Sequence, residues 1–117
     1  MKKIKIALVL IFSLQLTACD KLFDFQKQAD NSFGDQHFKT AISLIELHKI
    51  RFGEYPETLE DIQFSGQWDM IALQSVSYKK SAQGYDLDVV NGWVGKPELE
   101  YPKEFWQGLG IQESNMK

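Results

Sequence analysis

The chain is poor in the residues from which catalytic and metal centres are usually built. It has one cysteine, two histidines and three prolines among 117 residues. A lone cysteine excludes an intramolecular disulfide. No Gly-x-Ser-x-Gly elbow is present, and the glycines around Trp93 lack the length and the hydroxyl of a phosphate loop. The sequence therefore specifies no reaction, and we expect neither catalysis nor a cofactor.

The two histidines, His37 and His48, are eleven positions apart. On one helix they would share a face to within about 20°, but a rise of about 1.5 Å per residue places them about 16 Å apart. One metal ion cannot bind both, and neither has a second ligand four residues away. We interpret each histidine as a surface or core-edge residue and predict no metal site around them.

No apolar run is long enough to span a membrane. The longest, from Ile6 to Leu16, is about half of the ~20 residues that a transmembrane helix needs, and it contains Gln15. It follows a start with three lysines and precedes small residues, which is the layout of an export signal. We therefore predict that residues 1–18 are a signal peptide that is removed.

The four residues Leu16-Thr17-Ala18-Cys19 resemble the bacterial lipobox. The resemblance implies cleavage between Ala18 and Cys19 and acylation of Cys19, which also explains why an exported chain has a single cysteine. Two or three acyl chains hold a protein on a membrane persistently. We expect the chain to face the periplasm from the cell membrane or the outer membrane. Asp20 resembles the signal that retains lipoproteins of enteric bacteria in the inner membrane and slightly favours that location.

Cleavage would leave an acidic, aromatic-rich chain. Ten Lys and Arg then stand against sixteen Asp and Glu, a formal net charge of −6. Nucleic acid is not a plausible partner, and a surface without a basic stripe gains little from anionic lipid, so we expect the domain to stand off the membrane. Fourteen of the fifteen aromatic residues lie in this part, which predicts a packed core.

We divide the mature chain into a lipidated tether over 19–31 and a single small α+β domain over 32–117. The domain is predicted to begin with a helix from Ser32, capped by Asp35, to Phe52, with Gly53 as its left-handed cap. An apolar series through the tether also has helical spacing, so the tether could instead extend that helix: Leu22, Phe25, Ala29 and Phe33.

The predicted helix has one apolar stripe. Its members are Phe38, Ala41, Ile42, Ile45, His48 and Phe52, and the side facing away carries Lys39, Ser43 and Glu46. The cations in its last turn are more typical of helix-dipole electrostatics than of a binding site. Thr58 and Asp61 then repeat the capping spacing and predict a short helical turn.

Beyond this turn the apolar period changes to two. The series through Val76 and Tyr78 and the series through Tyr85, Leu87 and Val89 predict a hairpin. A third strand is predicted at Leu99 and Tyr101, between two prolines, and Trp93-Val94 could pair before it. We expect a small antiparallel sheet of three to four strands packed on the long helix.

The run from Glu46 to Ile62, with Gly53 and the pair Tyr55-Pro56 followed by a leucine-bearing turn, resembles the globular part of type II secretion pseudopilins. The resemblance implies a pilin-like meander and suggests a secretion or pilus-like apparatus. Pseudopilins carry a prepilin peptidase site and an apolar amino-terminal helix where this chain has a lipobox. Small envelope lipoproteins share the same layout.

Two groups of residues are weak candidate sites. If the predicted strands paired, Asp86, Asp88, Glu98 and Glu100 would form a four-carboxylate face that could bind calcium, although alternating acids also fit plain solvent exposure. The resemblance to pseudopilins implies a calcium-binding loop near the carboxyl end, but the positions after Tyr101 offer only Glu104 and Glu113 for it. The segment from Phe105 to Ile111 is either a packed loop or an exposed edge. If it is exposed, its aromatic residues form a partner surface together with Trp93: Phe105 and Trp106.

These observations favour a non-catalytic, lipid-anchored module that binds another envelope protein. Two alternatives stay open. One is an immunity or inhibitor lipoprotein against a periplasmic enzyme or toxin, for which the size, anchor and acidity are suitable. The other is a cation-binding domain that uses the acidic face.

Overall fold

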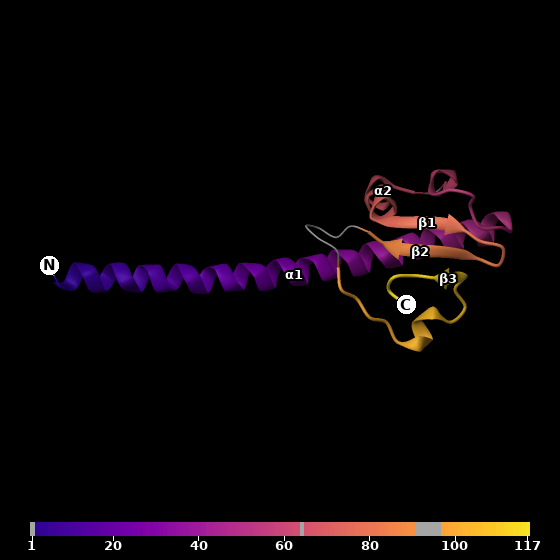
Figure 1. Cartoon of the computed structure of the whole chain (residues 1–117). Coiled ribbons are helices and arrows are strands. Elements are labelled where there is room, and N and C mark those ends of the chain that lie inside the picture. Colours follow the sequence, from indigo (N-terminus) through magenta and orange to yellow (C-terminus); the bar gives the residue numbers. More distant parts are fainter. Residues whose placement is uncertain (1, 64, 91–96) are drawn as a thin grey trace.

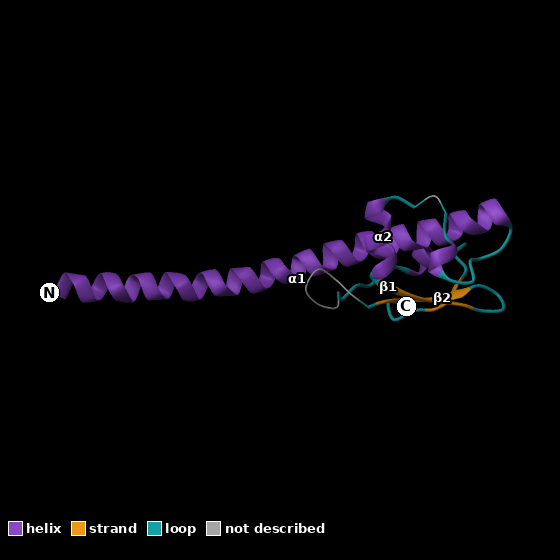
Figure 2. Ribbon diagram, turned by 90° about the horizontal axis from the view of Figure 1, so that it is seen from above, coloured by secondary structure: helices purple, strands orange, loops and turns teal. Residues whose placement is uncertain are grey.

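A computed structural model describes residues 2–63, 65–90 and 97–117, and for residues 2–20 and Phe23 it describes the backbone alone. The fold is α+β, as predicted: one long helix packs on a small sheet. The molecule measures 78 × 30 × 17 Å because the helix projects far beyond the globular part (Figure 1). In Figure 2 the helix and the sheet form two layers.

Helix α1 runs from Lys2 to Phe52 without a break. Its predicted end is confirmed: Gly53 has φ +83°, and its N–H donates to the Lys49 carbonyl at 2.7 Å. Its predicted start at Ser32 is wrong. No proline interrupts residues 19–31, and Ser32 is an exposed residue within the helix, so the alternative of a helical extension through the tether is confirmed.

The apolar stripe of α1 forms the core where it meets the sheet. Phe38, Ala41, Ile42 and Ile45 are buried as predicted, and Leu44 joins them. The predicted stripe also included two residues near the end of the helix that are not buried: Phe52 is 49% exposed, and His48 is half-buried. Lys39 and Ser43 are exposed as predicted, but Glu46 turns inward and is described below.

Three strands form the sheet in the order β1-β2-β3: Val76–Lys80, Tyr85–Val89 and Ile111–Glu113. The predicted hairpin is confirmed, with β1 and β2 antiparallel from Val76 opposite Val89 to Lys80 opposite Tyr85. The fully antiparallel sheet is wrong because β3 runs parallel to β2. The long connection from Val89 to Ile111 gives the chain the length that a parallel crossover requires.

The third strand that the sequence predicted at Leu99 and Tyr101 is also wrong, since this segment lies along α1 without pairing in the sheet. Pro97 packs on Gly34, where a Cβ would overlap the proline ring. The Glu98 N–H donates to Asn31 Oδ1 at 3.0 Å, and the Tyr101 hydroxyl donates to Asp35 Oδ1 at 2.8 Å. Leu99 and Tyr101 pack against the core, while Glu98 and Glu100 are exposed. An extended segment that lies on a helix therefore alternates with the same two-residue period as a strand. Trp93 and Val94 lie outside the described residues.

Besides α1, the described residues form three short helical elements. The predicted turn after Thr58 is the 3-10 helix η1, Leu59–Asp61, and the Thr58 N–H donates to Asp61 Oδ2 at 3.2 Å. A second 3-10 helix, η2, spans Lys103–Trp106. Helix α2, Gln67–Gln74, was not predicted and packs directly on α1 (Figure 1).

Candidate functional site

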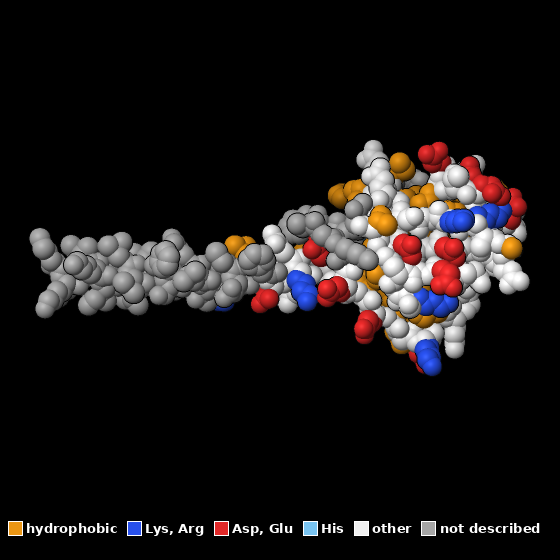
Figure 3. Space-filling model, viewed as in Figure 1, with side chains coloured by type: hydrophobic (Ala, Val, Ile, Leu, Met, Phe, Trp, Pro, Cys, Tyr) orange, Lys and Arg blue, Asp and Glu red, His pale blue; other side chains and the backbone are white. Residues whose placement is uncertain are grey.

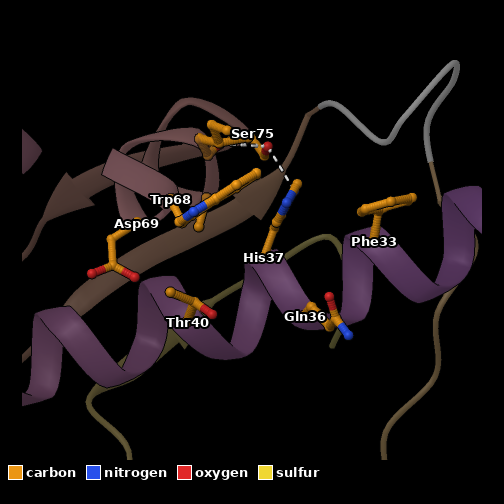
Figure 4. A pocket seen from close by; sticks show the side chains of 9 residues that line it. Phe33, Gln36, His37, Thr40, Trp68, Asp69 and Ser75 are labelled. Atoms are coloured by element: carbon orange, nitrogen blue, oxygen red, sulfur yellow. Dashed lines mark hydrogen bonds between the residues drawn. The ribbon is translucent and has the colours of Figure 1, made fainter. Parts of the chain in front are cut away.

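A groove opens between α1 and α2 (Figure 4). Its volume is about 530 Å³. The side chains that line it come from one face of α1 and from α2 with the residue after it: Phe33, Gln36, His37, Thr40, Trp68, Asp69, Ile71, Ala72 and Ser75. We call this feature the α1–α2 groove.

Helix α2 carries unusual apolar exposure for a short surface helix. Its start is fixed by the Gly66 N–H, which donates to Asp69 Oδ2 at 2.8 Å. Ala72 and Leu73 are buried against the body, yet Trp68 is 84% exposed and Ile71 is 44% exposed. Large apolar side chains gathered at the rim of a groove are typical of binding surfaces.

A hydrogen bond joins the two walls of the groove. His37 Nδ1 lies 3.0 Å from Ser75 Oγ, and Ser75 Oγ donates to the Ile71 carbonyl at 2.9 Å. Either imidazole tautomer can make this hydrogen bond, because the serine hydroxyl can donate or accept. Burial lowers the pKa of His37 below its usual 6.5, which keeps the ring neutral near pH 7.

The surroundings of Ser75 are poorly suited to a nucleophile. The residue is only 6% exposed, and its hydroxyl also bonds to the Ile71 carbonyl. Asp69 points away from His37 in Figure 4 and caps α2. The contact therefore holds α2 on α1 and shapes the groove.

On the other side of the core, Glu46 gathers three donors. Its Oε1 accepts from the Tyr85 hydroxyl at 3.0 Å and from the Gly110 N–H at 2.9 Å, and its Oε2 accepts from the Tyr55 hydroxyl at 3.0 Å. Burial, and then the hydrogen bond and negative charge of Glu46, raise the pKa of Tyr55 to about 12. This carboxylate ties α1 to the segment after Gly53, to β2 and to the residue before β3, so its role is structural.

The aromatic residues near the carboxyl end pack on α1. Phe105 and Trp106 are half-buried, and their rings lie 6.2 and 6.0 Å from that of Phe38, with Tyr101 stacked on Phe105 at 4.1 Å. The sequence left two alternatives open for this segment, a packed loop and an exposed edge. The packing of Phe105 and Trp106 on Phe38 matches the packed loop. Trp93, the third residue of the candidate partner surface, lies outside the described residues.

The four candidate carboxylates do not form one face. Asp86 and Asp88 lie on β2, where Asp88 Oδ1 accepts from the Asn115 N–H at 2.8 Å. Glu98 and Glu100 lie in the extended segment beside α1, and Glu98 Oε2 is 3.6 Å from Lys27 Nζ. The predicted four-carboxylate face required the segment at Leu99 and Tyr101 to pair as a strand, and this segment does not pair in the sheet. Among the residues that the structure describes, no three histidines, cysteines or acids lie together as metal ligands could.

The predicted cleavage and acylation site, Ala18 and Cys19, lies within α1. In residues 2–63, 65–90 and 97–117, no helix is both long and apolar enough to cross a bilayer. His48 lies far along the same helix from His37, and its Nδ1 is 3.0 Å from the Glu54 carbonyl.

Sequence reasoning missed the α1–α2 groove because it assigned no helix to residues 67–74. Two signals were present: Trp68, Ile71 and Ala72 have helical spacing, and Gly66 precedes Asp69 at the capping distance of three residues. Comparison of the chain with protein-family models, with curated proteins and with solved structures found no match.

Proposed function

We propose that this chain is a lipid-anchored envelope protein that faces the periplasm and acts as a non-catalytic protein-interaction module, in a secretion or pilus-like apparatus. The anchor rests on the export signal and on Leu16-Thr17-Ala18-Cys19. The module rests on one observation, the α1–α2 groove with the exposed side chains of Trp68 and Ile71 at its rim.

The groove has the character of a protein-binding site. Aromatic anchors that enter or frame a pocket dominate binding energies at interfaces. Trp68 has most of its surface in water, and the groove beside it offers apolar walls from Phe33, Ile71 and Ala72 with polar groups on His37 and Thr40. A partner side chain seated there would bury apolar surface and find hydrogen-bonding groups to fix its orientation.

The distance from the proposed anchor suits a partner at the membrane. His37 is eighteen residues after Cys19 on a continuous helix, which corresponds to about 27 Å along the axis. The groove therefore lies within reach of the periplasmic part of an integral membrane protein. The Ser75–His37 hydrogen bond supports a binding role over catalysis because both side chains are used to assemble the groove.

The anchor is tested by growing cells with an alkyne analogue of palmitate. We expect the full chain to take up the label and to sediment with membranes, and the Cys19→Ser chain to lose both. Label on the Cys19→Ser chain, or its absence from the wild-type chain, would refute the anchor.

The interaction is tested by a photo-cross-linking amino acid in place of Trp68, with Lys79 on β1 as the matched exposed control. We expect one specific protein adduct in intact membranes from position 68 and none from position 79. Equal labelling from both positions, or no adduct from position 68 in an anchored chain, would contradict a binding role for the groove.

A further inference from the structure

The projecting part of α1 carries an apolar series that reaches the groove at Phe33. Leu22, Phe25, Ala29 and Phe33 follow one another at intervals of three, four and four residues, and we call them the Leu22–Phe33 stripe. Leu22 is 59% exposed and Phe25 is 60% exposed, whereas Phe33 already lines the groove. Figure 3 shows hydrophobic side chains over α2 and on the same upper edge of the projecting helix.

From this continuity we propose that the Leu22–Phe33 stripe and the α1–α2 groove together bind one α-helix of an integral membrane protein, at the point where that helix leaves the membrane beside Cys19. The inference rests on the proposed function and specifies its partner. The bound helix carries apolar residues at alternating intervals of three and four, and it is flanked by basic residues.

The width of the stripe favours a helix as the occupant. At about 100° per residue, its four members span an arc of roughly 80°, which is the narrow seam of a helix pair rather than the broader face that helices present to a core. Over residues 21–36, no charged residue lies within about 60° of the centre of this arc. A partner helix can therefore pack there without desolvating a charge.

The charge of the projecting segment disfavours a lipid surface as the occupant. Helices that lie on membranes are usually rich in Lys and Arg on their polar face. Here that face carries both signs, with Asp24 and Lys27 as examples, and the mature chain has a formal net charge of −6. Asp69 adds a carboxylate at the wall of the groove, so basic residues on the bound helix would be complementary to its surroundings.

The position of α2 disfavours a second copy of this chain. A parallel copy would have to continue beside its neighbour past Phe33, but α2 occupies that side of α1, fixed there by the contact between His37 and Ser75. An antiparallel copy would place its own Cys19 beyond Phe33, more than about 20 Å from the membrane that holds the first. A helix that ends at the groove meets neither obstacle.

The start of the stripe indicates where the partner comes from. Leu22 is three residues after Cys19, about 4.5 Å along the helix, which is within the depth of the headgroup layer. A helix that contacts Leu22 must therefore already be at the membrane surface. Since the acyl groups on Cys19 hold this chain at that surface and a transmembrane span holds the partner there, membrane attachment meets much of the cost of bringing them together.

The test places a photo-cross-linking amino acid at Phe25 of the full chain in the source bacterium, with Asp24 on the opposite face of α1 as the matched control. Cross-linked peptides are identified by mass spectrometry. We expect position 25 to label a peptide adjoining a transmembrane span, with the predicted apolar spacing. We expect position 24 to give about a tenth of that yield or less.

A second experiment uses the cross-linker at Leu22 together with Phe25→Asp. A carboxylate in an apolar seam should lower the yield about tenfold, whereas Asp24→Asn should leave it unchanged. Adducts to lipid alone, to a second copy or to a segment remote from a membrane span, or no adduct from position 25, would overturn the inference. If position 68 still labels a protein in that case, the proposed function stands without it. If the chain is not anchored, both are overturned.

Discussion

The two halves of α1 hold similar apolar side chains in opposite environments. Phe38 and Ile45 have no exposed surface, while Leu22 and Phe25 leave more than half of theirs in water. The half from Phe38 onward packs on the sheet and on the aromatic cluster around Trp106. The half from Leu22 to Phe33 lines the groove at its far end and contacts Glu98 through Lys27 and Asn31. One half therefore stabilises the domain, and the other presents a surface.

The largest expected loss of stability comes from a substitution in the buried half of α1. Phe38 is fully buried, and Phe38→Ala should destabilise the mature chain by about 3–5 kcal/mol because it removes apolar contacts and leaves a cavity. Phe25→Ala is the matched change in the exposed half and should cost no more than about 0.5 kcal/mol. Urea unfolding measures both values. Similar losses for the two variants would show that the halves do not differ as described.

A smaller loss is expected at the polar junction between α1 and the sheet. Glu46→Ala leaves the Tyr55 and Tyr85 hydroxyls and the Gly110 N–H without their acceptor and should cost about 2–3 kcal/mol. Lys39→Ala, at an exposed position of the same helix, is the control and should cost about 0.5 kcal/mol or less. The midpoints of denaturant unfolding measure the stability of both variants. A Glu46→Ala chain as stable as the Lys39→Ala chain would contradict the structural role of Glu46.

Gly34 lies where the two halves meet, and its substitution tests how tightly the segment 97–102 packs there. A methyl group at position 34 would overlap Pro97. We expect Gly34→Ala to cost about 1–2 kcal/mol, although alanine is the better helix former by about 1 kcal/mol. Ser32→Ala, on the exposed side of the helix, should not destabilise. The thermal unfolding midpoints of the two variants measure these changes. A Gly34→Ala chain more stable than the wild type would disprove the close contact between Gly34 and Pro97.

The smallest effect is a pH dependence at the groove. The pKa of His37 is lowered by burial in the folded chain, so the unfolded chain binds the proton more readily. Stability from this site is therefore present above the usual 6.5 and is lost as the pH falls below it. Urea midpoints at about pH 7.5 and 5.5 should fall more for the wild-type chain than for His37→Gln. An equal fall in both chains would remove His37 as the cause.

The sequence predicted the elements whose causes are local. Gly53 ends α1 because glycine has no Cβ and readily adopts the left-handed conformation that closes a helix. The hairpin follows from the alternation of apolar residues between Val76 and Val89. The extended segment at Leu99 was taken for a strand because a chain lying along a helix also alternates between core and water. Period alone cannot distinguish these two environments.

The groove could not be predicted for a related reason. Trp68 and Ile71 lie at helical spacing, but apolar spacing indicates a buried face, and only the structure shows that these side chains are exposed beside a groove. Glu46 was placed on the outside because it lies away from the apolar stripe of the helix, and only the fold brings Tyr55, Tyr85 and Gly110 to it from other parts of the chain. Such long-range contacts leave no periodic signal.

The central claim is that the exposed half of α1 is completed by a partner, and hydrogen exchange tests it most directly. In the full chain purified alone, we expect the amides of residues 24–33 to exchange fast, because a short projecting helix is marginal, and those of 38–52 to exchange slowly. In cell membranes that contain the chain, the exchange of 24–33 should slow by about tenfold or more, and Phe25→Asp should abolish the change. Equal exchange of 24–33 in both preparations of the wild-type chain would contradict the account.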